Sequence, residues 1–321
     1  MTVRASILEL AQFIRASESR LLVITGAGVS TPSNIPDYRG PNGAYVKNKA
    51  YKPIQYQEFM SGHYYRQRYW ARSMLGYGNV QNAQPNVIHT VLANWQRRGR
   101  IHGIITQNVD SLHLKGGAQS VLELHGTLAR VECQSCKATT PRAEFQKQLV
   151  GLNPTFARHL NRPVSDEERV KTVIPPSHTS PGEGSRMPVS KAAAPMRPDG
   201  DVDMDSLEFS TFNYPSCSTC STGTLKPGVI FFGENIPGVV KDRATQLVND
   251  ARGVLVLGST LTTYSAYRLI RDATSRGVPV WCVTQGPTRA DALFTGKIEA
   301  QLEEVLPAVD AILEQLSTSS Q

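Results

Sequence analysis

Short apolar segments alternate along the chain with longer amphipathic ones. The short segments are nearly continuous in hydrophobic residues, as expected of strands that are buried on both faces of a parallel sheet. Strands are therefore predicted at 21–25, 103–106, 121–124, 229–232, 254–257 and 278–283. Apolar residues at helical spacing predict helices at about 85–98, 239–249, 264–276 and 298–316, preceded by an amphipathic helix around residues 7–14.

This alternation predicts an α/β fold with a doubly wound, Rossmann-like parallel sheet, in which a ligand lies at the carboxyl ends of the strands. The pattern fails between about 152 and 214, where no period is sustained. Residues 173–200 are crowded with Pro, Ser and Gly, a composition that buries too little apolar surface to offset chain entropy. We therefore predict a flexible insertion at about 152–214.

Four of the five cysteines form two CxxC pairs, Cys133 with Cys136 and Cys217 with Cys220. Two residues between thiolates let both sulfurs of a tight turn reach one ion, and two such turns complete a tetrahedral zinc site. Four thiolates leave no open position, so one structural zinc ion is predicted. Disulfides fit poorly with a chain that shows no secretory signal, and a redox motif would not need two copies. Cys282 lies in a predicted strand and is expected to be a core residue.

Composition and charge narrow the possible partners only slightly. The net charge is +7, and no acidic residue occurs between Glu58 and Asp110, where six arginines do. This stretch could meet nucleic acid or an anionic ligand, but a solvated basic face is the default expectation. No apolar run approaches the ~18 residues of a membrane span, and the N-terminus lacks the apolar block of a secretory signal.

The first predicted strand runs into a glycine turn, Gly26-Ala27-Gly28. Glycines at this point let the backbone approach a pyrophosphate, whose charge the N-terminus of the next helix would stabilise. The third glycine of the dinucleotide motif is missing, and no Lys-Ser/Thr pair follows to make a P-loop. On these residues alone, a simple strand-to-helix turn is an equal alternative.

Polar residues also follow the other predicted strands, in the segments 107–110, 125–126 and 258–260. Since strand carboxyl ends meet at one edge of such a sheet, these residues are expected to line one crevice. Among the seven histidines, His125 combines this position with a flanking glycine and is the best general-base candidate, with His113 as the fallback. The other five are expected to be surface or packing residues: His63, His89, His102, His159 and His178.

Taken together, these segments match a known family. The chain resembles the sirtuins, NAD-dependent protein-lysine deacylases, in TGAGVSTPSNIPDYRG, TQNVDSLH, LELHGT, the two CxxC pairs, GVIFFGE and LGSTLTTYSA. These motifs occur in the family's order and span nearly the whole chain except the insertion. PIQYQEF, RQRYWAR and GPTRADAL resemble the mitochondrial class II branch, of the sirtuin-four type.

The resemblance implies a reaction and a set of residues. The acyl-lysine amide oxygen attacks the nicotinamide ribose, nicotinamide leaves, and the acyl group departs on ADP-ribose. His125 takes a proton from a ribose hydroxyl, while Asn108 and Asp110 hold the ribose and nicotinamide pocket. The NAD-binding residues that the family implies are Gly26, Ala27, Gly28, Ser30, Thr31, Pro36, Asp37, Tyr38, Arg39, Tyr45, Gln107, Asn108, Val109, Asp110, Gly258, Ser259, Thr260, Thr284, Gln285, Gly286 and Leu302.

The resemblance also places the substrate. An open strand edge at 228–234 would bind the peptide through backbone hydrogen bonds, with the side chains or carbonyls of Ile230, Phe231, Phe232, Gly233 and Glu234 at the site. Tyr69 and Arg72 share one helical face, where some sirtuins place a pair that recognises acyl carboxylates. Carboxylate-bearing or bulky acyl groups are therefore expected to be favoured over acetyl. The alternative is a packed tyrosine and a solvated arginine.

Two positions depart from the family pattern. Asn34 stands where the family usually has glycine beside the cofactor loop, and asparagine tolerates a positive φ better than most residues. Thr284 replaces an asparagine near the adenosine ribose, which puts the strength of that contact in doubt. Neither change touches His125.

The motifs divide the chain into an NAD-binding domain and a smaller inserted module. The NAD-binding domain is expected at 1–45, 85–130 and 225–321, a helical part of the small domain at 46–84, and the zinc module at 131–224 with the insertion inside it. By resemblance the protein is expected in the mitochondrial matrix, with cytoplasm or nucleus as the alternative since Glu9 and Glu18 argue against a transit peptide. Acylated proteins are the expected partners of a monomer that binds no membrane.

Three other functions remain open on the sequence. A protein ADP-ribosyltransferase would use the same NAD site. A zinc-ribbon nucleic-acid-binding protein would explain the basic stretch, but not the polar residues at strand ends. An NAD-binding sensor with feeble turnover would explain the altered cofactor contacts.

Overall fold

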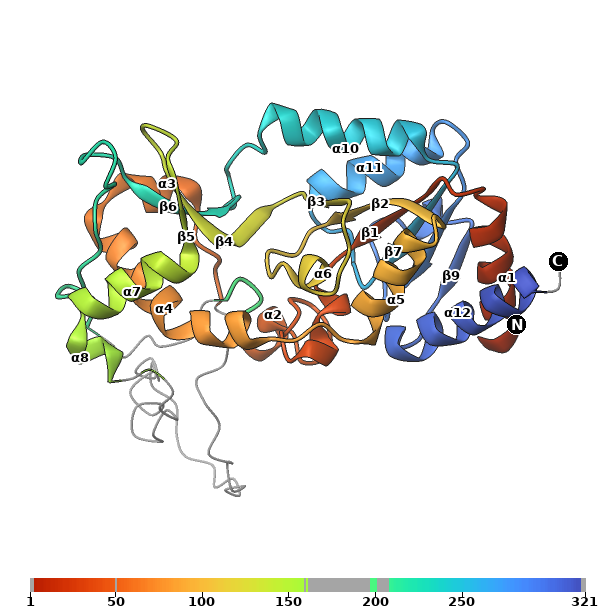
Figure 1. Cartoon of the computed structure of the whole chain (residues 1–321), viewed down its shortest axis with the longest axis horizontal. Helices are drawn as coiled ribbons and strands as arrows, with labels where there is room; N and C mark the ends of the chain where they lie inside the picture. Colours follow the sequence, from red (N-terminus) through yellow and green to blue (C-terminus); the bar gives the residue numbers. More distant parts are fainter. Residues whose placement is uncertain (1–2, 50, 159, 161–196, 201–207, 319–321) are drawn as a thin grey trace, which may run out of the picture.

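The computed structural model describes residues 3–49, 51–158, 160, 197–200 and 208–318, and divides them between a larger and a smaller sheet (Figure 1). The larger, six-stranded sheet lies at the right of Figure 1 with the chain ends, and the three-stranded sheet with its helices lies at the left. Within the described part of the chain, no helix combines the length and apolar character needed to cross a membrane.

All strands of the larger sheet are parallel, in the order β3-β2-β1-β7-β8-β9. Numbered along the sheet this is the 3-2-1-4-5-6 order of dinucleotide-binding folds, so the ligand crevice belongs at the carboxyl end of β1, where the order reverses. The strands are β1 (Leu21–Thr25), β2 (Ile101–Thr106), β3 (Val121–Glu123), β7 (Gly253–Leu257), β8 (Val280–Val283) and β9 (Gly296–Ile298). The predicted doubly wound sheet is confirmed, and β9 is an addition.

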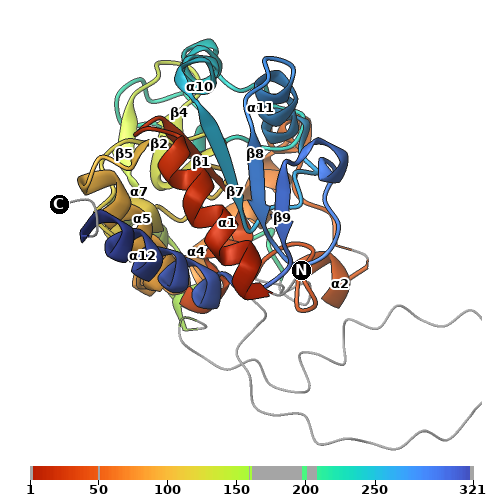
Figure 2. The same cartoon turned by 90° about the vertical axis from the view of Figure 1, so that its right-hand side faces the viewer.

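Alternate residues of the central strands feed two hydrophobic layers. Leu21 and Val23 of β1 face a cluster formed with α1 (Val3–Ala16), α5 (Val87–Arg97) and α12 (Leu302–Thr318). Leu22 and Ile24 face the opposite cluster, formed with α10 (Gly238–Asp250) and α11 (Tyr264–Thr274). Figure 2 shows α1 and α12 on one side of the strands and α11 on the other. Burial on both faces explains why these strands are apolar throughout.

The predicted parallel strand at 229–232 is wrong. The strand found there is β6 (Leu225–Val229), which pairs antiparallel with β4 (Gly126–Cys133) in the small sheet, completed by β5 (Thr139–Pro141). Beyond Val229 the chain is extended and makes one isolated bridge, between Phe232 and Gln55. Val229 and Phe231 are buried in the core of the small module, whereas Phe232 is exposed. The apolar run therefore indicated burial of some of its residues, but not which sheet the strand joins.

The small module has its own aromatic core. Trp70 and Phe145 pack with ring centroids 4.6 Å apart, and Phe59 and Phe212 are fully buried in the same cluster. Its helices are α3 (Tyr56–Ser61), α4 (His63–Asn82), α7 (Arg142–Leu152) and α8 (Pro154–Ala157). Short turns elsewhere are η1 (Ala27–Val29), η2 (Thr31–Ser33), α2 (Ala44–Lys47), α6 (Leu112–Lys115) and η3 (Asp291–Leu293).

Both ends of the predicted insertion pack onto this core. Asn153 donates to the carbonyl of Asn213 at 2.7 Å and accepts from its backbone N–H at 2.7 Å, which ties the two ends together. Gln67 of α4 donates to the carbonyls of Ser210 and Phe212. Flexibility was also predicted for residues 159, 161–196 and 201–207, which lie outside the described residues.

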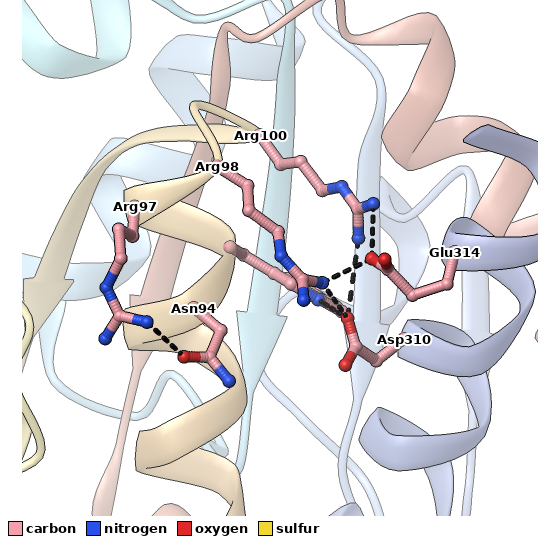
Figure 3. A network of polar contacts seen from close by, with 7 residues as sticks. Asn94, Arg97, Arg98, Arg100, Asp310 and Glu314 are labelled. Atoms are coloured by element: carbon pink, nitrogen blue, oxygen red, sulfur yellow. Dashed lines mark hydrogen bonds and ion pairs between the residues drawn. The ribbon is translucent and has the colours of Figure 1, made fainter. Parts of the chain in front are cut away.

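Much of the basic stretch makes contacts within the protein, although Arg97 and Arg98 are also exposed, as expected of a solvated face. Arg98 and Arg100, which follow α5, pair with Asp310 and Glu314 of α12 (Figure 3). Trp95 donates to Asp310 at 2.7 Å. Other members are held by carbonyls or buried, as Arg66 and Arg72 are. The acidic partners lie on the last helix, so the absence of acidic residues within the stretch itself could not reveal these ion pairs.

A buried histidine pair supports the fold beneath the crevice and makes its stability depend on pH. The rings of His89 and His113 pack at a tilt of 59° with centroids 4.8 Å apart, and His113 Nε2 lies 2.9 Å from Thr25 Oγ1. Burial lowers the pKa of His89 to about 4 and that of His113 to about 3. In the unfolded chain each histidine binds a proton with a pKa near 6.5, whereas in the folded protein it stays neutral to a lower pH. The contribution of the pair to the free energy of unfolding is therefore fully present above pH 6.5 and is lost as the pH falls toward the pKa values of the folded state.

We expect the free energy of unfolding to fall by about 2 kcal/mol per histidine between pH 6.5 and pH 5. Urea denaturation at both pH values measures this loss, and His89→Gln should remove about 2 kcal/mol of it. The control His63→Gln, at an exposed position, should leave the pH difference unchanged. A wild-type midpoint that is the same at both pH values would contradict the assignment.

Candidate active site

A cavity of about 570 Å³ opens at the carboxyl ends of β1, β2 and β7, where the strand order places the crevice. Among the described residues, its lining includes every residue predicted for cofactor, catalysis and substrate except Pro36, Arg72 and Gly286. The volume is within the usual range of small-molecule sites. The structure therefore brings the predicted residues together, while their individual roles stay predictions.

The glycine turn at the end of β1 packs closely against the loop that follows β7. A Cβ on Gly26 would lie 2.7 Å from Ser259 Cβ, and one on Gly28 would lie 2.9 Å from Gly258 Cα. These glycines are thus required for the β1 and β7 loops to pack against each other, with Gly28 N–H donating to the Gly258 carbonyl at 2.9 Å. The expected helix N-terminus is also absent among the described residues that follow, because two single 3₁₀ turns, η1 and η2, take its place.

A buried polar chain forms the floor of the cavity. Asn108 Nδ2 donates to Ser30 Oγ at 3.0 Å, and Ser30 donates to Asp110 Oδ2 at 2.7 Å. The other carboxylate oxygen of Asp110 accepts the backbone N–H of Leu112 at 2.9 Å. Burial raises the pKa of Asp110, and the hydrogen bonds from Leu112 and Ser30 oppose that rise. Asn108 and Asp110 are therefore fixed in place at the base of the cavity.

His125 follows β3 and is held at both ring nitrogens. Nδ1 lies 3.1 Å from the backbone carbonyl of Gln107, and Nε2 lies 2.8 Å from Ser265 Oγ. Burial lowers the pKa of His125, against the opposing effect of the Gln107 carbonyl, so the ring is neutral and able to accept a proton at neutral pH. The fallback candidate His113 is only 2% exposed, contacts Thr25 of β1 and does not line the cavity, whereas His125 does.

The segment after the glycine turn brings a cluster of aromatic side chains and an arginine to the cavity. Arg39 lies over the ring of Tyr45 at 5.0 Å, and Tyr38 and Tyr45 lie 5.9 Å apart. Asn34, the departure from the family's glycine, has φ 62° and ψ 21°. The expectation that asparagine accommodates a positive φ here is confirmed.

The segment expected to meet the substrate is fixed from both sides. Ile230 N–H donates to the carbonyl of His125 at 2.8 Å, and Phe231 N–H donates to Glu234 Oε2 at 2.8 Å. Lys226, 3% exposed, pairs with the same carboxylate oxygen at 3.1 Å and lies 4.7 Å from the Phe231 ring centroid. Burial lowers the pKa of Lys226 while Glu234 opposes the shift. The pair of buried Lys226 and partly buried Glu234 fixes the turn after Phe231, and the Ile230 hydrogen bond joins the segment to the histidine loop.

The four CxxC cysteines converge although the pairs are far apart in sequence. Their Sγ atoms all lie within 4.8 Å of one another, with Cys133–Cys220 at 3.7 Å and Cys136–Cys217 at 3.6 Å. Zinc–sulfur bonds of about 2.3 Å in a tetrahedron place sulfurs about 3.8 Å apart, so the residues fit a zinc ion. A Cβ on Gly223 would lie 2.1 Å from Cys133 Sγ, which explains a glycine at this point.

Several lining residues escaped the sequence interpretation. Three of them lie at the start of α11, within the LGSTLTTYSA motif: Thr263, Tyr264 and Ser265. Their polar side chains, just after a predicted strand and at the start of a predicted helix, could have indicated a place in the cavity. Pro53 and Ile54 begin the PIQYQEF motif. Pro198 and Asp199 come from the predicted insertion, and no local pattern marks them as part of a site.

A family model described as the Sir2 family matches residues 26–265, most of the chain. The chain belongs to the Sir2 family of sirtuins. It is similar to a protein of Batrachochytrium dendrobatidis named as the NAD-dependent protein deacylase SIR4, at 41% identity over 99% of this chain and 95% of that protein. It is also similar to bovine sirtuin-4, named as a mitochondrial NAD-dependent protein lipoamidase, at 39% identity over 94% of this chain and 85% of that protein.

Solved sirtuins share the fold. A structure titled for the mechanism and regulation of Sir2 enzymes aligns with a TM-score of 0.68 and 25% identity, covering 97% of this chain and 99% of that one. A Sir2 variant solved with a deacetylated p53 peptide and 3′-O-acetyl ADP-ribose aligns with a TM-score of 0.65 and 26% identity, over 95% and 97% of the two chains. The Sir2-like fold of this sirtuin is thus established, and the nucleic-acid-binding alternative is not favoured.

Proposed function

We propose that this sirtuin is an NAD-dependent protein-lysine deacylase, which releases nicotinamide and transfers the acyl group to ADP-ribose. The observation that carries the proposal is the neutral His125, whose Nε2 faces a cavity at the dinucleotide crevice. Relatives over nearly the whole chain are named as NAD-dependent deacylases, deacetylases and lipoamidases. These names support deacylation ahead of ADP-ribosyl transfer to protein or a sensor role.

In the proposed reaction, different residues of the cavity serve proton transfer, NAD binding and peptide binding. Bound NAD supplies an electrophilic ribose carbon with nicotinamide as the leaving group. His125 Nε2 accepts a proton from a ribose hydroxyl, which makes that oxygen the nucleophile for the acyl carbon. The floor formed by Ser30, Asn108 and Asp110 holds the ribose and nicotinamide in place. The segment 228–234 binds the peptide backbone beside His125.

The acyl preference rests on the wall that the small module contributes. Tyr69 lines the cavity with Pro53, Ile54 and Phe231, and its ring packs 5.3 Å from that of Phe231. Such a wall favours bulky acyl chains over acetyl. Arg72 is 4% exposed one turn further along α4 and outside the cavity lining. The geometry therefore supports preference for bulk more directly than preference for a carboxylate.

We expect glutaryl-lysine and lipoamide-type acyl-lysine peptides to be deacylated about 10-fold faster than acetyl-lysine, with nicotinamide and O-acyl-ADP-ribose released one for one. Mass spectrometry of both products across an acyl panel measures this and detects any ADP-ribose left on protein. Arg72→Ala should lower the glutaryl rate relative to the lipoamide-type rate. Equal turnover of acetyl and glutaryl peptides, unaffected by Arg72→Ala, would contradict the carboxylate preference.

The setting of the reaction follows from the relatives. The bovine relative is named as mitochondrial, which supports the mitochondrial matrix as the location of this sirtuin. Its partners are acylated proteins, and we keep the expectation of a monomer. Mass photometry and fractionation of the source cells test these two points.

A further inference from the structure

The hydrogen bonds of His125 define which of its nitrogens is the base. A backbone carbonyl only accepts, so the contact with Gln107 O requires the proton to sit on Nδ1. Nε2 then carries a lone pair, and the 2.8 Å contact with Ser265 must be donated by the serine hydroxyl. The acceptor nitrogen of His125 is thus Nε2, at the cavity, and it already accepts a hydrogen bond from the Ser265 hydroxyl.

Ser265 is itself tightly placed. It is the second residue of α11, between Tyr264 and Ala266, and the side chain of Ala266 is fully buried against the sheet. The N-cap residue Thr263 donates to Gln107 Oε1 at 3.1 Å, and Gln107 Nε2 donates to Ser259 Oγ at 2.8 Å. The loop before α11 therefore fixes Gln107, which holds Nδ1, while the first turn of α11 supplies the group at Nε2.

We propose that Ser265 is a positioning residue for the general base, holding Nε2 of neutral His125 toward the cavity until a ribose hydroxyl takes over that contact. The proposal rests on the proposed function for the identity of the reaction. In the acyl-transfer step the ribose O–H bond breaks, its proton goes to Nε2, and the oxygen forms a bond to the acyl carbon. Water then adds to that carbon, the acyl C–N bond breaks, and the lysine amine leaves with a proton. A hydroxyl suits this position because it donates to Nε2 before the transfer and can accept from Nε2–H afterwards.

This role separates the two halves of the reaction. Release of nicotinamide depends on attack by the acyl-lysine amide oxygen and needs no general base, whereas acyl transfer needs His125 correctly aimed. Ser265→Ala should therefore lower the rate of O-acyl-ADP-ribose formation about 10-fold and leave nicotinamide exchange within about 2-fold. Ser265→Thr keeps the hydroxyl and should restore most of the transfer rate.

A matched control lies on the same helix. Ser275 at the C-terminal end of α11 donates to the Asp272 carbonyl at 3.0 Å, away from the cavity. Ser275→Ala removes a hydroxyl from α11 without touching His125, and it should change neither rate. If Ser265→Ala lowers exchange and transfer equally, or lowers neither, the positioning role is overturned.

A spectroscopic reading of His125 needs no enzymatic activity. In the protein without substrates, the ¹⁵N resonances of the His125 ring should show a protonated Nδ1 and a hydrogen-bonded, unprotonated Nε2. The Nε2 resonance should move in Ser265→Ala and return in Ser265→Thr. An identical resonance in wild type and Ser265→Ala would overturn the proposal, whereas a wild-type protein that forms no O-acyl-ADP-ribose would overturn the proposed function instead.

Discussion

His125→Ala is expected to lower the rate of O-acyl-ADP-ribose formation by about 10³-fold, the largest loss of activity from any single substitution in this sirtuin. Among the described residues His125 is the histidine that lines the cavity; burial lowers its pKa, so the ring is neutral, and its Nε2 contacts Ser265 there. Nicotinamide exchange should persist, since the nucleophile for that step comes from the substrate. Steady-state rates for both reactions, measured at saturating NAD, decide the outcome.

Two other histidines provide the comparison. His63 is exposed and contacts Tyr214 of the small module, so His63→Ala should leave both rates near wild type. His113→Gln disturbs the buried contact with Thr25 and should lower the melting temperature while folded protein keeps its turnover. If folded His125→Ala still deacylates and His113→Gln does not, the base has been misassigned.

Removing the metal is expected to have the largest effect on stability. The four sulfurs connect two distant turns of the chain: Cys136 and Cys217 are 81 residues apart, and Cys133 and Cys220 are 87 residues apart. Cys133 and Cys217 are buried in the core of the small module. Structural zinc sites supply on the order of 10 kcal/mol of binding free energy, about the whole stability of a domain. Chelation by 1,10-phenanthroline should therefore unfold the small module and abolish activity indirectly.

Cys217→Ser tests the site directly. Elemental analysis should give about one zinc per chain in the wild type and far less in Cys217→Ser, with a melting temperature at least 10 °C lower. Cys282 lies fully buried in β8, remote from the cluster, so Cys282→Ala is the matched control and should keep its zinc. A Cys217→Ser protein that retains one zinc and its melting temperature would refute the structural role.

The sequence alone determined the parallel sheet, the metal site and the position of the candidate active site. β1 and β7 are recognisable because burial on both faces leaves a local signal, an unbroken apolar run. The cysteines predict a zinc site because the two-residue spacing of the ligands in each CxxC turn is visible in the sequence itself. The proximity of polar residues such as Asn108 and His125 could be predicted from the sequence, because the carboxyl ends of parallel strands lie at one edge of the sheet.

Only the tertiary structure decided which groups partner each other across long distances in the chain. Val229 and Phe231 pack into the core of the small module while Phe232 stays exposed, and Arg98 and Arg100 pair with a helix about 210 residues later. Arg72 shares a helical face with Tyr69, yet only Tyr69 of the two reaches the cavity. Ser265 meets His125 across 140 residues. Such contacts depend on how separate elements pack, and no periodicity within one element records that.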